Sequence, residues 1–219
     1  LDAIRSWKDS VVSKLSKGIA QLAKVRNVQV LQGMVTFDSP TQLSVKLENG
    51  TQSITFDNCI IATGSRPATI PNFPTDHPRI INSTGALKLG DIPKILLVIG
   101  GGYIGLEMGS VYNALGTQVT VVEFMPSLLP GADEDLVRPL ARKLKKAFEN
   151  IYLSTKVSKV EPADNEVTVF FEGSDGKEFS EIFDTVLVSV GRKPNTENLG
   201  LENAEIILAD KGFIPVNVK

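Results

Sequence analysis

The chain has 219 residues, of which 42% are hydrophobic and 22% are charged, so it can bury one large core or two modest ones. No apolar run approaches the roughly 18 residues of a membrane-spanning helix. The formal net charge of −2 gives no whole-chain attraction to nucleic acid or to an anionic membrane. One cysteine, Cys59, excludes an internal disulfide and a dithiol centre within these residues, and it fits a reducing cytoplasm.

The first third of the chain predicts one helix and several short strands. Apolar residues recur at helical spacing over residues 1–24. Strands are expected at residues 28–31, 43–47 and 53–56, the last two flanking an Asn-Gly turn. Residues 56–64, FDNCIIATG, form an apolar run that ends in glycine, and we expect a buried strand with Cys59 as a buried thiol. The only histidine, His77, lies in a proline-rich connection and is expected at the surface.

The stretch from Ile95 to Glu123 has the pattern of a dinucleotide-binding unit: strand, glycine turn, helix, strand. Residues 95–99, ILLVI, form a continuous apolar run, as in a parallel strand buried on both faces. Apolar residues then recur at helical spacing until Gly116, and residues 119–122 are again strand-like. Three glycines follow the first strand in the spacing G-x-G-x-x-G: Gly100, Gly102 and Gly105.

Each glycine has a physical task in such a unit. Gly100 permits the tight turn, Gly102 lets the backbone approach a pyrophosphate, and Gly105 lets helix and strand pack closely. The N-terminus of the helix can bind the phosphates through its unpaired N–H groups. Glu123 lies eighteen positions after Gly105, near the interval expected for the acid that hydrogen-bonds a ribose 2′-hydroxyl. The sequence therefore predicts NAD rather than NADP.

The rest of the chain completes the predicted fold. Residues 133–148 begin with three acids, which predicts a second helix with a solvated basic face. Strands are expected at residues 151–160, 166–171 and 183–191. The fold class predicted is α/β, a Rossmann-like domain with a parallel sheet and a three-stranded antiparallel meander. The apolar face of the second helix is expected at Leu136, Leu140, Leu144 and Phe148.

Residues 56–64 and 183–191 form an internal repeat. Both open with Phe-Asp, continue as an apolar run and close with a glycine that Arg and Pro soon follow. The offset is 127 residues, and only the second copy has a glycine turn upstream. If both copies descend from one nucleotide-binding domain, the first copy's turn precedes Leu1. We therefore expect the chain to be part of a longer protein, and a natural protein that began at Leu1 would contradict this.

Together these segments resemble a known family, the flavin-dependent pyridine nucleotide-disulfide oxidoreductases, which bind FAD and NAD(P)H in two such domains. The likeness covers essentially the whole chain. It implies that residues 1–85 are a partial FAD-binding domain, residues 86–191 an NAD-binding domain, and residues 192–219 a segment returning to the FAD-binding domain. The segments that carry it are VIGGGYIGLEMGSVYNALGTQVTVVEF, IIATGSRP, VSVGRKPN and NSTGAL.

The resemblance also implies site residues and no metal site. Glu107 would approach the nicotinamide and pair with a lysine on the flavin side; the alternative is that it only complements the helix dipole. FAD contacts are implied at Thr63, Gly64, Ser65 and, through the backbone, Val35. NAD contacts are implied at Gly100, Gly101, Gly102, Tyr103, Ile104, Gly105, Glu107, Glu123, Val157 and Gly191.

The activity implied is oxidation of dihydrolipoamide, with electrons passing through a disulfide and FAD to NAD. Such members of the family serve the lipoyl domain of 2-oxo acid dehydrogenase complexes as homodimers, in the cytoplasm or, in a eukaryote, in the mitochondrial matrix. The redox cysteine pair, catalytic histidine and flavin turn of the family are not among these 219 residues, so the chain alone is expected to be inactive. Alternatives are another FAD-dependent disulfide reductase, of the mercuric or glutathione reductase type, and a non-catalytic NAD-binding module.

Overall fold

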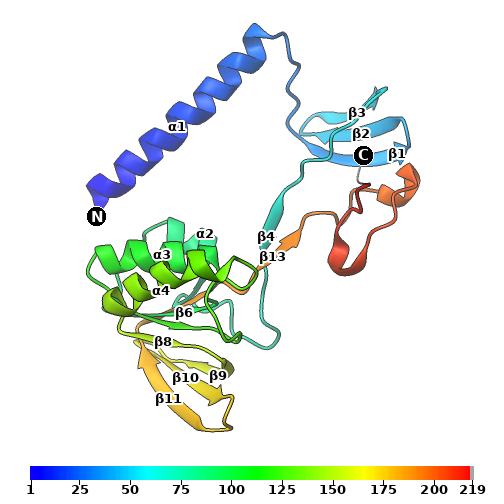
Figure 1. The fold of residues 1–219 in the computed structure, drawn as a ribbon. Coiled ribbons are helices and arrows are strands. Elements are labelled where there is room, and N and C mark those ends of the chain that lie inside the picture. The colour runs from blue at the N-terminus through cyan, green and yellow to red at the C-terminus, as the bar shows by residue number, and fades with distance from the viewer. Residues whose placement is uncertain (218–219) are drawn as a thin grey trace. The chain divides into compact units, whose positions relative to one another are not determined.

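The computed structural model describes residues 1–217, and the chain divides into two compact units, each described here by itself (Figure 1). The first unit comprises residues 1–66 together with residues 193–219, and the second comprises residues 67–192. Within the described range, no helix is long and apolar enough to cross a membrane.

The first unit contains the predicted N-terminal helix and a small antiparallel sheet. Helix α1 (Asp2–Val25) has no buried residue, so its apolar stripe lies on the surface, where Trp7 is 70% exposed. The sheet has the order β1-β2-β3, and Gly50 turns the second hairpin at φ 137°, as the Asn-Gly pair predicts. The remaining elements of this unit are β1 (Met34–Ser39), β2 (Gln42–Leu47), β3 (Gly50–Thr55) and the 3-10 helices η1 (Leu201–Ala204) and η2 (Asp210–Gly212).

Two strands predicted for the first unit do not form. Residues 28–31 and 56–64 have no regular structure, and the apolar run of the second segment is exposed rather than buried. Ile60 is 91% exposed, and Cys59 is an exposed thiol, so the expectation of a buried cysteine is wrong. The physical reason is that a strand needs a neighbour for its backbone hydrogen bonds, and no described strand pairs with either segment.

The second unit is built on a five-stranded parallel sheet in the order β5-β12-β6-β7-β8. The apolar run at residues 95–99 is its central strand, as predicted, and Leu96, Leu97 and Val98 are fully buried. Gly116 ends the following helix at φ 99°. The elements are β5 (Ile80–Asn82), α2 (Ser83–Leu87), β6 (Ile95–Ile99), α3 (Tyr103–Ala114), β7 (Gln118–Val122), α4 (Glu134–Ala147), β8 (Asn150–Tyr152) and β12 (Thr185–Val188).

The parallel sheet lies between two layers. Helices α2, α3 and α4 cover one face, and the predicted antiparallel meander covers the other (Figure 1). Side chains alternate between the two cores: Leu96 and Val98 of β6 face the helices, whereas Leu97 and Ile99 face the meander. The meander strands, in the order β11-β10-β9, are β9 (Thr155–Pro162), β10 (Val167–Gly173) and β11 (Glu178–Phe183). The α/β fold class is thereby confirmed.

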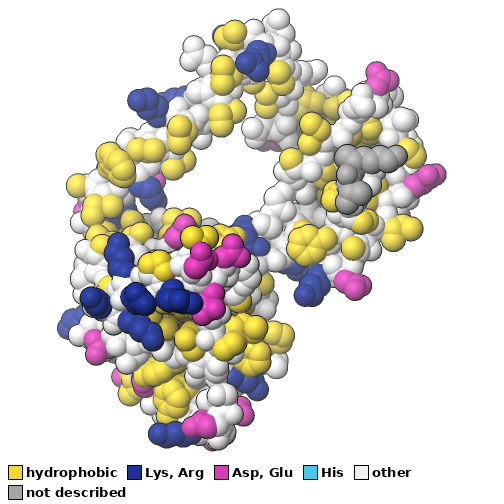
Figure 2. Space-filling view, in the orientation of Figure 1, with side chains coloured by type: hydrophobic (Ala, Val, Ile, Leu, Met, Phe, Trp, Pro, Cys, Tyr) yellow, Lys and Arg dark blue, Asp and Glu magenta, His cyan; other side chains and the backbone are white. Residues whose placement is uncertain are grey.

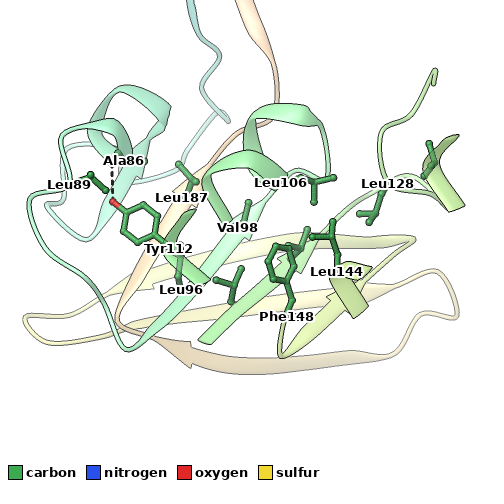
Figure 3. Close-up of a cluster of buried hydrophobic side chains, with 13 residues drawn as sticks. Ala86, Leu89, Leu96, Val98, Leu106, Tyr112, Leu128, Leu144, Phe148 and Leu187 are labelled. Atoms are coloured by element: carbon green, nitrogen blue, oxygen red, sulfur yellow. Dashed lines mark hydrogen bonds between the residues drawn. The ribbon is translucent and has the colours of Figure 1, made fainter. Parts of the chain in front are cut away.

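The core on the helix side joins distant parts of the chain (Figure 3). Leu106 of α3 and Leu144 of α4 lie in the same cluster as Val98 of β6. The hydroxyl of Tyr112 is buried there and donates to the carbonyl of Ala86 at 3.0 Å, so α3 and α2 are joined by a satisfied hydrogen bond. This packing fixes the position of α3 on the sheet.

Helix α4 differs in one respect from its prediction. Leu140, Leu144 and Phe148 pack in the core, but Leu136 is 68% exposed and Val137 is buried in its place. Its basic side chains lie on the surface, where Figure 2 shows Lys and Arg gathered in this region. This agrees with the predicted solvated face, which comprises Arg138, Arg142, Lys143, Lys145 and Lys146.

The boundary between the units differs from the division made at residue 85. Strand β5 pairs in parallel with β12, and α2 packs against α3, so residues 67–85 group with the second unit. Strand β5 was not predicted from the sequence, because it follows a proline-rich connection and its three residues are too few to show a strand period. Assignment of the first unit to flavin binding stays a prediction.

Candidate functional site

A cavity of about 700 Å³ opens in the second unit, at the carboxyl ends of β6, β7 and β12. The strand order reverses between β12 and β6, and ligands of open α/β sheets bind at such a switch point. The lining residues are Ile70, Ile99, Gly100, Gly102, Tyr103, Ile104, Val122, Glu123, Phe124, Pro130, Thr155, Lys156, Val157, Ser189, Val190, Gly191 and Arg192.

The glycine turn forms one wall of this cavity, and the structure assigns its glycines different tasks. Gly100 has φ 107°, and a Cβ there would lie 2.5 Å from the carbonyl oxygen of Ser189. A Cβ on Gly105 would overlap the carbonyl oxygen of Gly100. Gly102 meets nothing within 4 Å of an added Cβ, so the space beside it is open for a ligand. These are the roles of tight turn, close packing and ligand approach that the motif predicts.

Helix α3 points its N-terminus at the cavity. Gly102 caps it in an extended conformation, and the first intrahelical bond runs from Leu106 N–H to Gly102 C=O. The N–H groups of Tyr103, Ile104 and Gly105 belong to the first turn, where a helix has no internal acceptors. Residues 103 and 104 line the cavity, so this wall offers backbone donors and the positive end of a helix dipole to an anion.

Glu123 places a buried carboxylate beside the turn. Its side chain follows β7 and is only 8% exposed. Oε2 accepts from the N–H of Gly101 at 2.6 Å, and Oε1 accepts from the N–H of Met125 at 2.7 Å. Each carboxylate oxygen can accept a second hydrogen bond, so a sugar hydroxyl can still donate to either one.

The remaining walls are mostly apolar. Val157 of β9 and Val190 after β12 line the cavity, as does Phe124, which is 71% exposed. Two cations line it, Lys156 and Arg192, and the amino group of Lys156 lies 3.8 Å from the carboxylate of Glu172. An apolar cavity with backbone N–H donors at one end and one carboxylate suits a nucleotide.

The structure brings together most of the predicted NAD residues. Gly101 and Gly105 are buried behind the turn rather than in the cavity wall, and Glu107 is exposed on α3 outside that wall. Whether Glu107 acts at the nicotinamide stays a prediction. The predicted residues that line the cavity are Gly100, Gly102, Tyr103, Ile104, Glu123, Val157 and Gly191.

The predicted FAD residues lie in the first unit. Val35 is on β1, whereas Thr63 and Gly64 lie in the irregular segment and Ser65 begins β4 (Ser65–Pro67). Asn195 holds that segment through the carbonyls of Thr63 and Gly64, both at 3.0 Å. Flavin contacts at these four residues therefore stay predictions.

Several cavity residues were not predicted from the sequence. The Ser189 hydroxyl donates to the carbonyl of Ile99 at 2.9 Å and so ties the end of β12 to the glycine turn. Its position two residues before the repeat's closing glycine was an available signal, because the ends of neighbouring parallel strands meet. Phe124 and Pro130 carried no signal.

The described residues contain no group of three or more side chains placed to hold a metal ion.

Comparison with known proteins points to a single family. A family model described as pyridine nucleotide-disulphide oxidoreductase matches residues 2–219. Dihydrolipoyl dehydrogenases from Vibrio cholerae and Haemophilus influenzae are 42% and 44% identical over 217 and 218 residues, 99% of this chain in both cases. The counterpart from Bacillus subtilis is 43% identical over 212 residues, 96% of this chain. The chain spans about half the length of these relatives, 46%, 45% and 45%.

Solved structures show the same likeness. The HOCl-induced flavoprotein disulfide reductase RclA from Escherichia coli matches at a TM-score of 0.82 with 30% sequence identity. The match covers 97% of this chain and 48% of that protein. Its Cu(II) complex matches at a TM-score of 0.82 with 31% identity, covering 97% and 47%.

Proposed function

Because this chain belongs to the pyridine nucleotide-disulphide oxidoreductase family, we propose that its second unit binds NAD within a longer flavoprotein that oxidises dihydrolipoamide. In that protein electrons pass from the dithiol through a disulfide and FAD to NAD. The support for this substrate is the identity of about 40% with dihydrolipoyl dehydrogenases over nearly the whole chain.

One observation carries the choice of NAD, namely the buried carboxylate of Glu123 in the cavity wall. Its free acceptor positions suit the hydroxyl groups of the adenosine ribose. A 2′-phosphate in the same place would meet the like charge of a largely buried carboxylate, where such repulsion is stronger than between groups in water. Lys156, a nearby cation, already has Glu172 as a partner.

The residues present fit this cofactor. The first-turn N–H groups of α3 would hold the pyrophosphate against Gly102, and Val157 and Gly191 would lie beside the nucleotide. When bound, NAD accepts the hydride. Glu107, exposed one turn into α3, is proposed to approach the nicotinamide end. Contacts with FAD are proposed at Val35, Thr63, Gly64 and Ser65 in the first unit.

The partner and setting belong to the same proposal. A protein of this activity would act as a homodimer on the lipoyl domain of a 2-oxo acid dehydrogenase complex. The single cysteine among these residues and the bacterial relatives support a cytoplasmic setting. Co-sedimentation of the longer protein with a lipoylated domain would test the partner.

The activity is tested in the longer protein that contains this chain. Purified with FAD, it should form NADH in a dihydrolipoamide-dependent reaction, and the isolated 219-residue chain should not.

Glu107→Gln should slow reduction of the flavin by NADH if Glu107 acts at the nicotinamide, whereas unchanged kinetics would leave it only a dipole-complementing role. A longer protein that holds FAD but does not oxidise dihydrolipoamide would contradict the proposed substrate.

A second candidate is a different flavoprotein disulfide reductase. The observation that favours it is the structural match to RclA at 30% identity. The same preparation distinguishes the two: rapid NADPH oxidation with another disulfide or a metal ion, and no reaction with lipoamide, would support this alternative. A longer protein that binds NAD but no flavin would instead be a non-catalytic module.

A further inference from the structure

The carboxylate of Glu123 holds the glycine turn from behind, through the N–H of Gly101. We propose that Glu123 is a positioning residue for the pyrophosphate as well as an acceptor for the ribose. It fixes the turn that aims the N–H groups of α3, so its loss weakens every diphosphate ligand of the cavity, including one without ribose hydroxyls. This inference rests on the proposed NAD site.

Each carboxylate oxygen of Glu123 accepts one hydrogen bond from a backbone N–H. The distances of 2.6 Å to Gly101 N and 2.7 Å to Met125 N are those of charge-assisted hydrogen bonds, which are about twice as strong as neutral ones. The bond to Gly101 is buried, so water competes little for it, and the bond to Met125 is partly buried. The acid is therefore a structural part of the turn before any ligand binds.

Hydrogen bonds hold both the N–H and the carbonyl of Gly101. Its N–H donates to Glu123, and its carbonyl accepts from the N–H of Leu129 at 2.9 Å. A Cβ at this position would lie 2.8 Å from the side chain of Leu128 and 3.1 Å from Cβ of Glu123. Because Gly101 has no side chain, Leu128 and Glu123 can pack directly against its backbone. Residue 101 thereby links the turn to the segment after β7.

Glu123 is itself fixed to the sheet. Its N–H donates to the carbonyl of Tyr152 at 2.8 Å, and its carbonyl accepts from the N–H of Thr155 at 3.1 Å. The carbonyl of Met125 accepts from the N–H of Ser154 at 3.0 Å. A residue whose backbone is anchored in this way can hold its side chain, and with it the turn, in one position, which is what preorganised binding of an anion requires.

Removing the carboxylate leaves two backbone donors without their acceptor. Gly101 is buried, so its N–H would lose a partner at a place that water reaches poorly. The turn would relax, and the donors of α3 would no longer be aligned before the ligand arrives. A glutamine is not equivalent, because its amide group has one acceptor atom and would present N–H to one of the two N–H groups.

The test separates the two roles by using probes with and without ribose hydroxyls. ADP and 2′,3′-dideoxy-ADP are titrated calorimetrically into the 219-residue chain and into Glu123→Ala and Glu123→Gln. Both probes keep the diphosphate. Glu123→Ala should weaken binding of ADP about a hundredfold and of dideoxy-ADP about tenfold, which is about 2.8 and 1.4 kcal/mol. ADP loses both the aligned turn and the ribose contact, whereas dideoxy-ADP loses only the aligned turn. Glu123→Gln should weaken both probes less.

Asp184→Asn is the matched control. Its carboxylate also accepts a backbone N–H, that of Ile95 at 2.9 Å, but at the start of β6 and away from the glycine turn. This variant should bind both probes as the parent chain does. Amide resonances of Gly101 and Met125 should shift upfield in Glu123→Gln, because the charge-assisted bonds are lost, and should stay unchanged in Asp184→Asn.

The outcomes distinguish this inference from the function on which it rests. Weaker binding of both probes by the Glu123 variants, with the affinities of the control unchanged, supports it. Weaker binding of ADP alone, with dideoxy-ADP bound as tightly as by the parent chain, overturns the positioning role and leaves the NAD site standing. A parent chain that binds neither probe overturns the proposed NAD site, and the positioning role with it.

Discussion

Gly102 and Gly105 belong to the same motif, yet the structure constrains them in different ways. At Gly105 a side chain would collide with the backbone of Gly100, whereas at Gly102 it would project into open space. Gly102 has φ −75°, which any residue can adopt. A substitution at Gly102 can therefore impair ligand binding without impairing the fold, whereas a substitution at Gly105 affects both.

We predict that Gly102→Ala folds as stably as the parent chain but loses at least tenfold in NAD affinity, because its methyl group occupies the space proposed for the pyrophosphate. Gly105→Ala should lower the free energy of unfolding by about 1–3 kcal/mol through overpacking, and should lose NAD as well. Thermal unfolding and NAD titration measure the two effects. Gly18→Ala, in α1 with nothing within 4 Å, is the control and should be neutral or stabilising. Normal NAD binding by Gly102→Ala would place the pyrophosphate elsewhere.

Strand β8 shows how an element beside the site is held. Tyr152 packs against Phe171 and Phe179 of the meander, and its hydroxyl donates to Oε1 of Glu181 at 2.5 Å. Burial, the hydrogen bond to Glu181 and the charges of Glu181 and Glu149 raise the pKa of Tyr152 to about 12. The protonated phenol is thus favoured in the folded state.

This raised pKa predicts a loss of stability in alkali. An unfolded tyrosine ionises near pH 10, so between about pH 10 and 12 the unfolded chain releases a proton that the folded chain keeps. The contribution of Tyr152 is therefore complete below about pH 10 and declines above it. Urea unfolding of Tyr152→Phe and the parent chain should show a stability difference that shrinks as pH rises through this range. A difference independent of pH would contradict the assignment.

The repeat shows what the sequence could and could not predict about elements. Residues 183–191 and 56–64 share one pattern, but only the first of these contains a strand, β12, between β5 and β6. The other segment is exposed and irregular. An apolar run shows that a segment can be buried, but it forms a strand only where a neighbouring strand supplies partners for its backbone hydrogen bonds. The equivalent ends of the two copies, β4 and β13 (Arg192–Pro194), do pair with each other.

At the scale of the whole molecule, the glycine turn, its helix and the acid after β7 were predictable because each needs a particular residue at a particular spacing. The opposite wall of the cavity was not, since Ile70 and Pro130 reach it only through the tertiary fold. The second role of Glu123 was hidden for the same reason: spacing suggested the ribose, and only the structure reveals Gly101 and Met125 as its donors.

We propose that the second unit is an NAD site and that Glu123 determines its specificity. A calorimetric titration of the 219-residue chain with NAD and with NADP measures this specificity most directly. NAD should bind at least tenfold more tightly, a difference of about 1.4 kcal/mol, because the buried carboxylate accepts a ribose hydroxyl and repels a 2′-phosphate. Comparable or tighter binding of NADP, or no binding of NAD, would contradict the claim.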